Sequence, residues 1–369
     1  MILVLNPYDS DGYSGPSILA RRLFAELQSD GNQVLAVTRN NMRATWAVRT
    51  VRVRGPQKLG VLGQLVWALG ASAAVLRHSR RARLVHVHGA YIFNLIPAAL
   101  ALLLGRRVVV MPLLAGGDLR LDARSAGIPG SGRLRRYVLG NAFVGLSLSD
   151  GIAHEFEAWG MPRRNIIRFD NLVDLAKFAP PSGPDGRHSR QVVGFIGQLG
   201  ERKGACTVLA ALALLRKRGL HATALFVGPF EDESFADRFW NLAEKLDVTA
   251  FVHVTGHLPD VSAIVSNQIT VFALPSRAEG MPGALCECLA AGVPAVVSDV
   301  GAMGEVIRES QGGAVVEPDD PIGLADALSR FLVDSTLWAE HSQRVSDYGR
   351  SRFGSEACAR RYTTLCLDQ

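Results

Sequence analysis

The sequence predicts an α/β protein with two doubly wound, Rossmann-like domains that face a central cleft. The length of 369 residues suits two domains. Apolar runs of strand length alternate with helix-like periodicity in both halves of the chain. A segment rich in proline, glycine and serine, at 179–186, interrupts this alternation and is interpreted as the domain linker. The repeated strand–helix–strand units favour parallel sheets.

The first series of elements lies in residues 1–180. Helical spacing of apolar residues from Ile18 to Leu27 predicts a helix over 15–30. Ser149 is expected to cap a later helix. The other elements expected here are strands at 2–6, 33–38, 84–88, 107–111, 142–147 and 165–168, and helices near 94–104, 133–141 and 149–159.

The second series begins at 191. Its elements are expected as strands at 192–196, 222–227, 251–254, 269–274, 295–298 and 313–316, and helices at 205–218, 234–246, 261–266, 282–291 and 322–333. A helical segment at 337–367 follows and could cross back to the first domain. The predicted domains are therefore 1–180, joined by a C-terminal helix at about 350–369, and 190–349.

Composition narrows the environment of the protein. The chain has five cysteines, an odd number without zinc-type spacing, which favours reduced thiols and a cytoplasmic location. The apolar run at 1–5 is too short for a secretory signal and has no basic segment before it. We expect it to form a buried strand instead.

Basic residues are concentrated in the first half of the chain. The net charge is +6 overall, but residues 1–180 carry +12 and residues 181–369 carry −6. Such a basic half favours an anionic partner, such as a membrane surface or a lipid phosphate, although each basic cluster could also be a solvated face. Nucleic acid is not expected, because no aromatic-interleaved binding motif accompanies the basic clusters.

An uncharged stretch at 59–76 is followed by basic residues from Arg77 to Arg83. Its length just reaches the lower limit for a membrane-spanning helix, but Gln64, Ser72 and several glycines weaken that interpretation. Three readings stay open: a buried core helix, a helix that docks on a membrane surface, and a spanning helix. The first is favoured.

A glycine-bearing loop with a lysine follows the strand at 192–196. Its sequence runs from Gly197 to Gly204 and includes Lys203 just before the next helix. A helix N-terminus and an ammonium group can together bind a diphosphate. The loop lacks the GxxxxGK[ST] pattern of a P-loop. The alternative is a glycine turn with an exposed lysine.

Two glutamates follow the apolar strand at 269–274. Glu279 lies on the loop after the strand, and Glu287 lies about one turn into the next helix. Open α/β sheets bind ligands at the carboxyl ends of their strands. The turn between the glutamates, Gly280 to Ala284, offers backbone N–H groups to a phosphate. Two carboxylates beside a phosphate site suggest a nucleotide-sugar pocket; the alternative is an exposed loop acid and a helix-face acid.

Candidate residues in the first half are fewer. Gly12 and Gly15 follow the first strand and would allow a ligand to approach the backbone closely, although their spacing departs from the dinucleotide fingerprint. Asp9-Ser10-Asp11 matches a metal-binding DxD only formally, and no metal is expected there.

Two histidines and an aspartate complete the candidates. His86 and His88 share one face of a strand, and no further zinc ligands lie nearby in the sequence. His88 ends its strand and could line the cleft. Asp118 follows the next strand and could meet a substrate hydroxyl; the alternative is a turn aspartate.

Residues 193–305 resemble the retaining GT-B glycosyltransferases of family 4, also described as glycosyl transferases group 1. The family pattern is P-S-x-x-E-G-x-P/G-x-x-L-x-E-A-x-A-x-G-x-P, and this chain has Pro275-Ser276 and the Glu279…Glu287 pair in that setting. Gly301 to Ile307 resembles the G-G-x-x-E-x-I that follows. Asn171 to Phe178 is similar to the N-G-V-D-x-x-x-F at the end of the first domain.

The resemblance implies roles for these residues. Glu287 would hold the nucleotide ribose, and Glu279 would contact the donor sugar near the transferring carbon. Together with Lys203, the backbone N–H groups of the turn would surround the diphosphate. This turn consists of Gly280, Met281, Pro282, Gly283 and Ala284, and all of these residues except the proline have an N–H group. No metal or cofactor is expected beyond the nucleotide diphosphate sugar itself, because lysine and helix dipoles take the place of a metal.

The chain departs from the family pattern at two places. The family usually has arginine where Gln198 stands, so Arg202 or Arg277 would have to supply that cation. Many members also carry a His-Gly pair after the strand at 108–111, where this chain has Ala115-Gly116-Gly117. His88 and Asp118 are the candidates to replace that histidine.

The resemblance implies a metal-independent, retaining hexosyltransferase of cell-envelope or exopolysaccharide biosynthesis. The acceptor would be a lipid-linked saccharide or a polysaccharide bound by the first domain, while the second domain binds the nucleotide sugar. The enzyme would be cytoplasmic, and a peripheral position on the inner face of the cytoplasmic membrane is also expected as an option. Two alternatives stay open: a sugar-nucleotide epimerase on the same fold, and a non-catalytic GT-B binding protein. The sequence leaves the sugar, the base and the acceptor undetermined.

Overall fold

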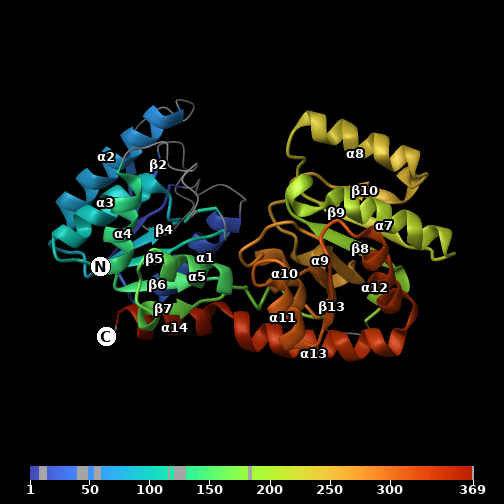
Figure 1. Ribbon diagram of the computed structural model, residues 1–369. Helices are drawn as coiled ribbons and strands as arrows, with labels where there is room; N and C mark the ends of the chain where they lie inside the picture. Colours follow the sequence, from blue (N-terminus) through green and yellow to red (C-terminus); the bar gives the residue numbers. More distant parts are fainter. Residues whose placement is uncertain are drawn as a thin grey trace. The chain divides into compact units, whose positions relative to one another are not determined.

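The computed structural model describes residues 1–7, 15–39, 49–53, 60–114, 117–119, 130–181 and 185–367. The chain forms two compact units, of which unit 1 comprises Met1–Leu172 with Ser355–Gln369 and unit 2 comprises Val173–Gly354 (Figure 1). The chain therefore passes from unit 1 to unit 2 at Leu172, upstream of the proline-rich segment that we expected as the linker. That segment belongs to unit 2.

Unit 1 is built on a seven-stranded parallel sheet in the order β3-β2-β1-β4-β5-β6-β7. The strands are β1 (Ile2–Leu5), β2 (Val34–Arg39), β3 (Arg49–Val53), β4 (Leu84–His88), β5 (Arg107–Met111), β6 (Val144–Ser147) and β7 (Ile166–Arg168). The edge strand β3 was missing from the sequence prediction, because its two exposed arginines, Arg49 and Arg52, give the segment a polar appearance.

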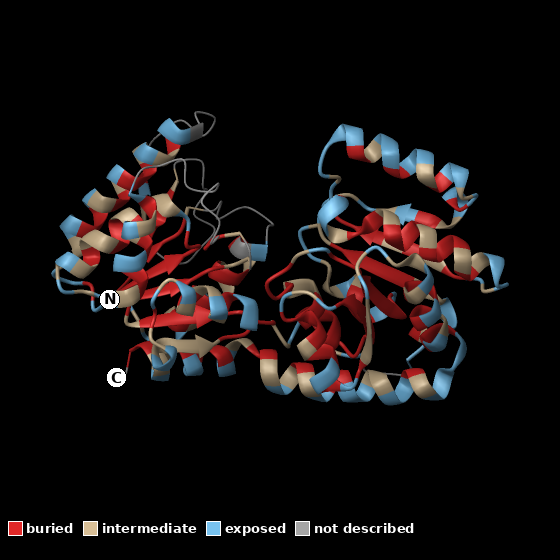
Figure 2. Ribbon diagram, viewed as in Figure 1, coloured by how far each residue is buried: buried red, intermediate tan, exposed pale blue. Residues whose placement is uncertain are grey.

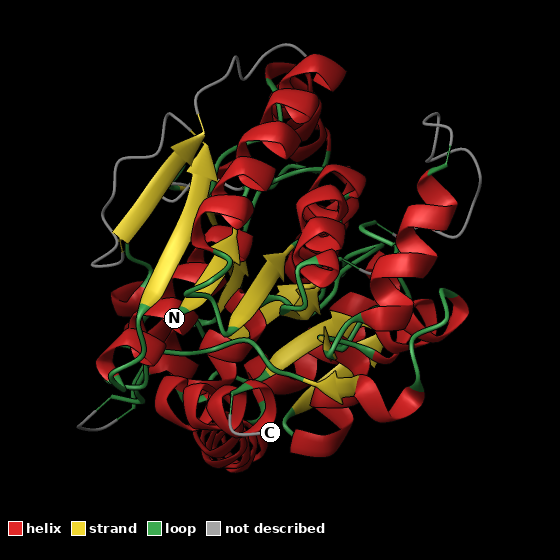
Figure 3. Ribbon diagram, turned by 90° about the vertical axis from the view of Figure 1, so that its left-hand side faces the viewer, coloured by secondary structure: helices red, strands yellow, loops and turns green. Residues whose placement is uncertain are grey.

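Helices cover both faces of this sheet (Figures 1 and 3). Helices α2 (Gly60–His78), α3 (Ile92–Leu103) and α4 (Ser131–Asn141) pack side by side on one face. Helices α1 (Gly15–Ser29) and α14 (Ser355–Cys366) pack against each other on the other face. Helix α5 (Asp150–Ala158) packs on β6 and β7 on the same side as α4, where the Arg135 guanidinium of α4 lies over the Trp159 ring at the end of α5. Ser149 caps α5 as expected, because its hydroxyl accepts a hydrogen bond from the Ile152 amide.

Helix α14 closes the core of unit 1 although it comes from the end of the chain. It packs against α1. Its Tyr362 is fully buried, and the Tyr362 hydroxyl lies 2.9 Å from Nδ1 of His86. The predicted helical segment at 337–367 is therefore two helices, since α13 (Ser335–Phe353) belongs to unit 2 and ends just before Gly354.

Unit 2 repeats the same architecture with a six-stranded parallel sheet in the order β10-β9-β8-β11-β12-β13. The strands are β8 (Val192–Ile196), β9 (Thr223–Val227), β10 (Val252–Val254), β11 (Val271–Leu274), β12 (Ala295–Ser298) and β13 (Gly313–Val316). The helices are α6 (Arg187–Arg190), α7 (Ala205–Lys217), α8 (Glu233–Lys245), α9 (Ser262–Asn267), α10 (Gly283–Ala290), α11 (Met303–Ser310) and α12 (Pro321–Val333), followed by α13.

The central strands of both sheets are buried on both faces, as parallel sheets require (Figure 2). This explains why β1 and β11 are continuous apolar runs, and why β4 and β12 are mostly apolar, so that all four could be recognised in the sequence. The predicted fold class, two doubly wound Rossmann-like α/β domains, is confirmed.

The uncharged stretch at 59–76 forms most of α2. One side of this helix is buried on the sheet through Trp67, Ala71 and Val75. In the part of the chain that the structure describes, no helix combines the length and the apolar character needed to cross a bilayer.

Candidate functional site

The strand order of unit 2 places one switch point at the centre of its sheet. From β8 the chain continues to β9 on one side, whereas β11 lies on the other side of β8. The loops that leave β8 and β11 therefore diverge at their carboxyl ends, where open α/β sheets bind ligands. These two loops carry Lys203 and Glu279, the residues that the sequence selected.

Hydrogen bonds and two glycines hold three loops together at this point. The Arg277 amide donates to the Arg202 carbonyl at 2.8 Å, and the Ala302 amide donates to the Gly280 carbonyl at 2.8 Å. At Gly301, where φ is +59°, a Cβ would lie 2.4 Å from the carbonyl oxygen of Glu279. At Gly204, where φ is +73°, a Cβ would lie 2.4 Å from the Pro275 carbonyl. Only glycine permits this close approach.

Glu279 is the centre of the site. Its Oε1 lies 2.9 Å from Nζ of Lys203 and 3.0 Å from the guanidinium of Arg202, and it accepts a hydrogen bond of 3.2 Å from the Ser276 hydroxyl. Among the described residues, all hydrogen bonds and ion pairs of this carboxylate fall on Oε1, and none falls on Oε2. The second oxygen is thus available to a ligand.

The charge of Glu279 is set by two opposing effects. Its carboxylate is buried, with 8% of the residue exposed, and burial by itself raises the pKa. The positive charges of Lys203 and Arg202, with hydrogen bonds from Lys203 and Ser276, outweigh burial and hold the pKa of Glu279 below its usual value. The residue is therefore an anion at neutral pH.

The structure distinguishes between the two arginines that could replace the missing cation at Gln198. Arg202 reaches into the site, where it contacts Glu279 and donates to the Ala278 carbonyl at 2.7 Å. Arg277 is instead paired with Asp319 at 2.8 Å and lies 3.6 Å from Glu201. Gln198 is exposed on the loop after β8. Arg202 is therefore the second cation of the cluster.

Helix α10 directs its N-terminus toward the loop that carries Glu279. Gly280, Met281 and Pro282 are buried, while Gly283 and Ala284 are half-buried at the first turn. No side chain caps this helix end. Its first N–H groups and its positive dipole end are therefore suited to an anion. Glu287 lies on the second turn and is buried, with 6% of the residue exposed.

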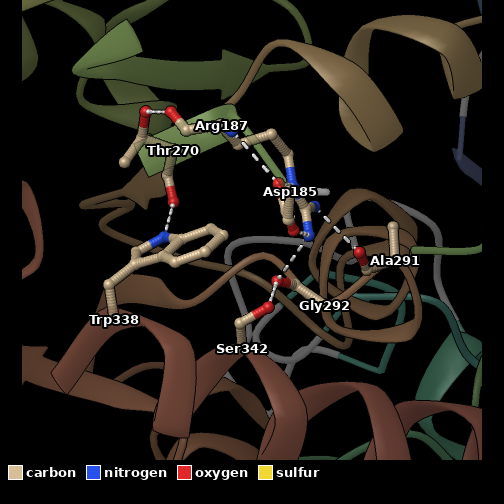
Figure 4. A network of polar contacts seen from close by, with 7 residues as sticks. All are labelled: Asp185, Arg187, Thr270, Ala291, Gly292, Trp338 and Ser342. Carbon is tan, nitrogen blue, oxygen red and sulfur yellow. Dashed lines mark hydrogen bonds and ion pairs between the residues drawn. The ribbon is translucent and has the colours of Figure 1, made fainter. Parts of the chain in front are cut away.

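A buried arginine fixes the opposite end of α10 (Figure 4). The guanidinium of Arg187 donates to the carbonyls of Ala291 at 2.9 Å and Gly292 at 3.3 Å, and it pairs with Asp185 at 2.5 Å. The Ser342 hydroxyl also donates to the Gly292 carbonyl, at 2.6 Å. A cation at the carbonyl end of a helix is stabilising because of the helix dipole.

The indole of Trp338 completes this network. Its ring centroid lies 5.5 Å from the Arg187 guanidinium carbon, and its N–H donates to the Thr270 carbonyl at 2.8 Å. Sequence reasoning did not identify Arg187, which is only 1% exposed. An arginine directly after a proline- and glycine-rich segment is expected at the surface. Its burial follows from the tertiary structure and not from the local sequence.

His88 is the last residue of β4. Its side chain is fully buried in unit 1, edge-on to Phe24 at a centroid distance of 6.3 Å and stacked with His86 at 5.8 Å. Helix α1 covers the face of β4 on which both histidines lie, and the catalytic role expected of His88 stays a prediction. His88 is a core residue here.

Asp118 lies where the chain leaves β4 and β5. Its carboxylate accepts hydrogen bonds from the amides of Leu113 at 2.8 Å and Ala90 at 3.3 Å, so it joins the two segments that follow these strands. Only 1% of the residue is exposed, and burial raises the pKa of its carboxyl despite these hydrogen bonds. Gly15 is the exposed first residue of α1.

Some expected features lie outside the described residues. They are Gly12, the Asp9-Ser10-Asp11 sequence and the Ala115-Gly116 pair. Within the described ranges, no group of three or more histidine, cysteine, aspartate or glutamate side chains is arranged to hold a metal ion.

Two family models match nearly the whole chain. The model described as "Glycosyl transferase 4-like domain" matches residues 14–171, and the model described as "Glycosyl transferases group 1" matches residues 184–352. This chain is a group 1 glycosyltransferase. Its fold is similar to that of HepE from Anabaena, whose structure in complex with UDP superposes with a TM-score of 0.81, at 16% identity and with 100% of both chains covered.

Sequence relatives of this glycosyltransferase include a lipopolysaccharide core biosynthesis mannosyltransferase, LpcC, of Rhizobium leguminosarum. It is 29% identical over 50% of this chain and 54% of its own length. A phosphatidyl-myo-inositol mannosyltransferase of Mycolicibacterium smegmatis is 32% identical over 49% of this chain and 46% of its own length. The alignments thus span about half the length of these curated relatives.

Proposed function

We propose that this glycosyltransferase is a retaining, metal-independent hexosyltransferase of cell-envelope or exopolysaccharide biosynthesis. It would move a hexose from a nucleotide diphosphate sugar to a lipid-linked saccharide or a polysaccharide. The observation that carries the proposal is the cluster of Lys203, Arg202 and Glu279 at the carboxyl ends of β8 and β11. Two cations and one buried anion in that position match a diphosphate and the sugar attached to it.

In this proposal the diphosphate is bound by Lys203, Arg202 and the N-terminus of α10. Both cations contact Glu279 in the present structure, at 2.9 and 3.0 Å. An incoming diphosphate shares or takes over these contacts, so donor binding is coupled to the position of Glu279. When the bond to the sugar breaks, negative charge grows on the leaving phosphate, and fixed cations in a site of low water content stabilise it strongly.

Glu279 then acts on the sugar itself. Its ionised Oε2 has no hydrogen bond or ion pair with the described residues. This oxygen accepts hydrogen bonds from donor-sugar hydroxyls and stabilises positive charge near the transferring carbon. Glu287, one turn into α10, holds the ribose hydroxyls, as in the family pattern. Retention follows from attack on the face from which the phosphate leaves, with the departing phosphate accepting the proton of the acceptor hydroxyl.

Unit 1 supplies the acceptor site in this proposal. Its segment 1–172 carries a net charge of +12, which suits a phosphate-bearing, lipid-linked acceptor. The names of the relatives, a lipopolysaccharide core mannosyltransferase and a phosphatidyl-myo-inositol mannosyltransferase, support acceptors of this class. Asp118 remains the candidate to bind an acceptor or donor hydroxyl, and Gly12 and Gly15 remain candidates for close approach of the donor. The enzyme would work at the cytoplasmic face of the membrane.

The proposal is tested by ligand-dependent thermal stability followed by turnover. UDP-, GDP- and ADP-sugars are screened with the full chain, because a ligand that binds only the folded state raises its unfolding temperature. We expect one nucleotide to stabilise the wild type and to lose most of its effect in Lys203→Ala. Lys217→Ala, an exposed lysine in the last turn of α7, is the matched control.

Products of the stabilising donor then decide among the candidate functions. Transfer to a lipid-linked or polysaccharide acceptor with the anomeric configuration kept supports the proposal. Conversion of the donor into an epimer without acceptor indicates the epimerase alternative. Nucleotide binding without any turnover indicates a binding protein, and no stabilisation by any nucleotide rejects the donor site.

A further inference from the structure

The outward face of α2 carries a stripe of exposed apolar side chains, which half-buried Ser72 interrupts once. Five large apolar residues of this 19-residue helix are exposed by 43% to 72%: Val61, Leu62, Leu65, Leu69 and Leu76. Because successive residues of an α-helix turn by about 100°, these five side chains lie within about 100° of arc. The opposite side of the same helix is already buried on the sheet, so the stripe is a second apolar face (Figure 2).

Such a face is unusual for a helix that covers a sheet in water. The solvent side of a surface helix normally carries charged and polar residues. In α2, no residue between 60 and 76 is charged. The neighbouring helix α3, which packs along α2, adds Leu103 with 73% exposure near its end. An exposed apolar surface of this kind marks a site of interaction.

A cluster of arginines adjoins the stripe. Arg77 lies in the last turn of α2, and Arg80, Arg81 and Arg83 follow directly, all exposed. In the described part of unit 1, none of the ion pairs involves Arg77, Arg80 or Arg81. The sequence offers them no acidic neighbour either, because residues 31–117 contain no aspartate and no glutamate.

We propose that the α2 stripe and this arginine cluster form a docking surface for an anionic phospholipid bilayer. The helix, about 28 Å long at 1.5 Å per residue, lies in the plane of the interface with its leucines among the acyl chains. The arginines bind the anionic headgroups at one end of the helix. A spanning helix plays no part in this arrangement.

Charge favours a bilayer over a second copy of the chain. Two copies that met through α2 in parallel would bring two arginine clusters together, and an antiparallel contact would place each cluster at the other end of its partner's helix. In neither case would residues 31–117 offer a carboxylate to compensate the arginines. An anionic membrane complements both properties, the apolar stripe and the unpaired positive charge. The inference extends the proposed function, on which it rests only for the lipid-linked acceptor, since the surface lies outside the donor site in unit 2.

The test measures co-sedimentation of the full chain with vesicles of phosphatidylcholine, alone or mixed with phosphatidylglycerol. We expect binding to the mixed vesicles and little binding to phosphatidylcholine alone. Leu65→Gln with Leu69→Gln should weaken partition by about tenfold or more, because two apolar side chains no longer insert. Arg80→Glu with Arg81→Glu should weaken it by a similar factor and remove the preference for phosphatidylglycerol.

Matched variants in unit 2 control for general changes in polarity and charge. Ile322→Gln with Val333→Gln removes two apolar side chains of similar exposure, 60% and 63%. Lys217→Glu with Lys245→Glu reverses two exposed charges in the last turns of α7 and α8. Both controls should bind the mixed vesicles as the wild type does, and unfolding temperatures should show that all variants fold.

Three results would overturn the proposal. The first is that the wild type does not bind the mixed vesicles. The second is that the α2 variants bind these vesicles as well as their controls do. The third is that light scattering shows a wild-type dimer and that the leucine variants are monomers. Glu279→Gln separates this test from that of the proposed function, because it alters the donor site alone. Vesicle binding by an enzyme that transfers no sugar would leave the docking surface standing while the proposed function fails.

Discussion

The ammonium group of Lys203 lies 2.9 Å from Oε1 of Glu279, although 76 residues separate the two in the sequence. The contact joins the loops after two adjacent strands, β8 and β11, and it places a buried anion beside a cation at the ligand-binding edge of the sheet. Arg202 adds a second cation at 3.0 Å from the same oxygen. This small cluster gives the donor site its electrostatic character and makes its parts testable one at a time.

Replacement of Lys203 by alanine should remove most of the turnover. A fixed cation on the leaving phosphate contributes more in the transition state than in the bound donor, and loss of one such group costs about 10²–10³ in rate. The measurement is initial rate at saturating donor. Lys217→Ala should keep the wild-type rate; if Lys203→Ala also keeps it, the phosphate role of Lys203 is wrong.

Glu279→Gln should keep the fold but lose turnover, by about 10²-fold or more. Glutamine can still accept hydrogen bonds but carries no charge to stabilise the transferring sugar. The wild-type pKa is lowered by Lys203 and Arg202, so Glu279 stays ionised as the pH falls toward its usual value of 4.5. Rate and unfolding temperature are measured together, with Glu244→Gln on the exposed side of α8 as control.

Arg202→Ala should weaken donor binding, whereas Arg277→Ala should leave it nearly unchanged. Arg202 contacts Glu279, while Arg277 is held by Asp319 at 2.8 Å. Gln198→Arg, which restores the residue usual in the family, should rescue much of the loss when added to Arg202→Ala. The test compares the donor dissociation constants of the wild type, the two single alanine variants and the double variant. A larger effect of Arg277→Ala than of Arg202→Ala would reverse the assignment.

Arg187→Met should destabilise the protein by about 3 kcal/mol or more, because it leaves the Ala291 and Gly292 carbonyls and the Asp185 carboxylate without their buried cation. Since these carbonyls lie at the end of α10, donor affinity should fall as well. Chemical denaturation gives the change in free energy of unfolding. Arg190→Met, an exposed position of the same short helix, should change it little.

Unit 1 should lose stability in mild acid because of His86. Burial, and to a lesser extent the neighbouring His88, holds the pKa of His86 well below its usual 6.5. The unfolded chain therefore binds a proton that the folded chain does not, and stability decreases as the pH falls below about 6.5, by up to about 1.4 kcal/mol per pH unit for one proton.

His86→Asn should flatten this dependence even though it lowers stability at neutral pH through the lost contact with Tyr362. Unfolding is followed from pH 8 to pH 5. His253→Asn, at an exposed position of β10, should leave the slope unchanged. An unchanged slope in His86→Asn would assign the acid sensitivity to other groups.

Much of the fold could be predicted because buried parallel strands consist largely of consecutive apolar residues, which can be recognised in the sequence. The strand before Glu279 and the helix that carries Glu287 follow from hydrophobic pattern and glycine positions alone. The edge strand β3 could not be predicted in this way, because two of its five residues, Arg49 and Arg52, are exposed. The pairing of Lys203 with Glu279 depends on strand order, which no local spacing encodes, and the sequence pointed to it only through the family resemblance.

Two other features also needed the tertiary structure. Period-two spacing correctly placed His86 and His88 on one face of β4, but it could not say that α1 and α14 cover that face. Likewise, the sequence around Arg187 does not indicate its partners, since Ala291, Gly292 and Trp338 are more than 100 residues away along the chain. Such long-range contacts decide which polar residues are buried.

The location of α14 has a consequence for the synthesis of the protein. Unit 2 is a continuous segment, Val173–Gly354, inserted between the two parts of unit 1. On the ribosome, unit 2 can complete its core while unit 1 still lacks the helix that brings Tyr362 over His86. Unit 1 is therefore translated first but finishes folding last. A nascent chain released before residue 355 would expose the apolar surface of unit 1 that α14 normally covers.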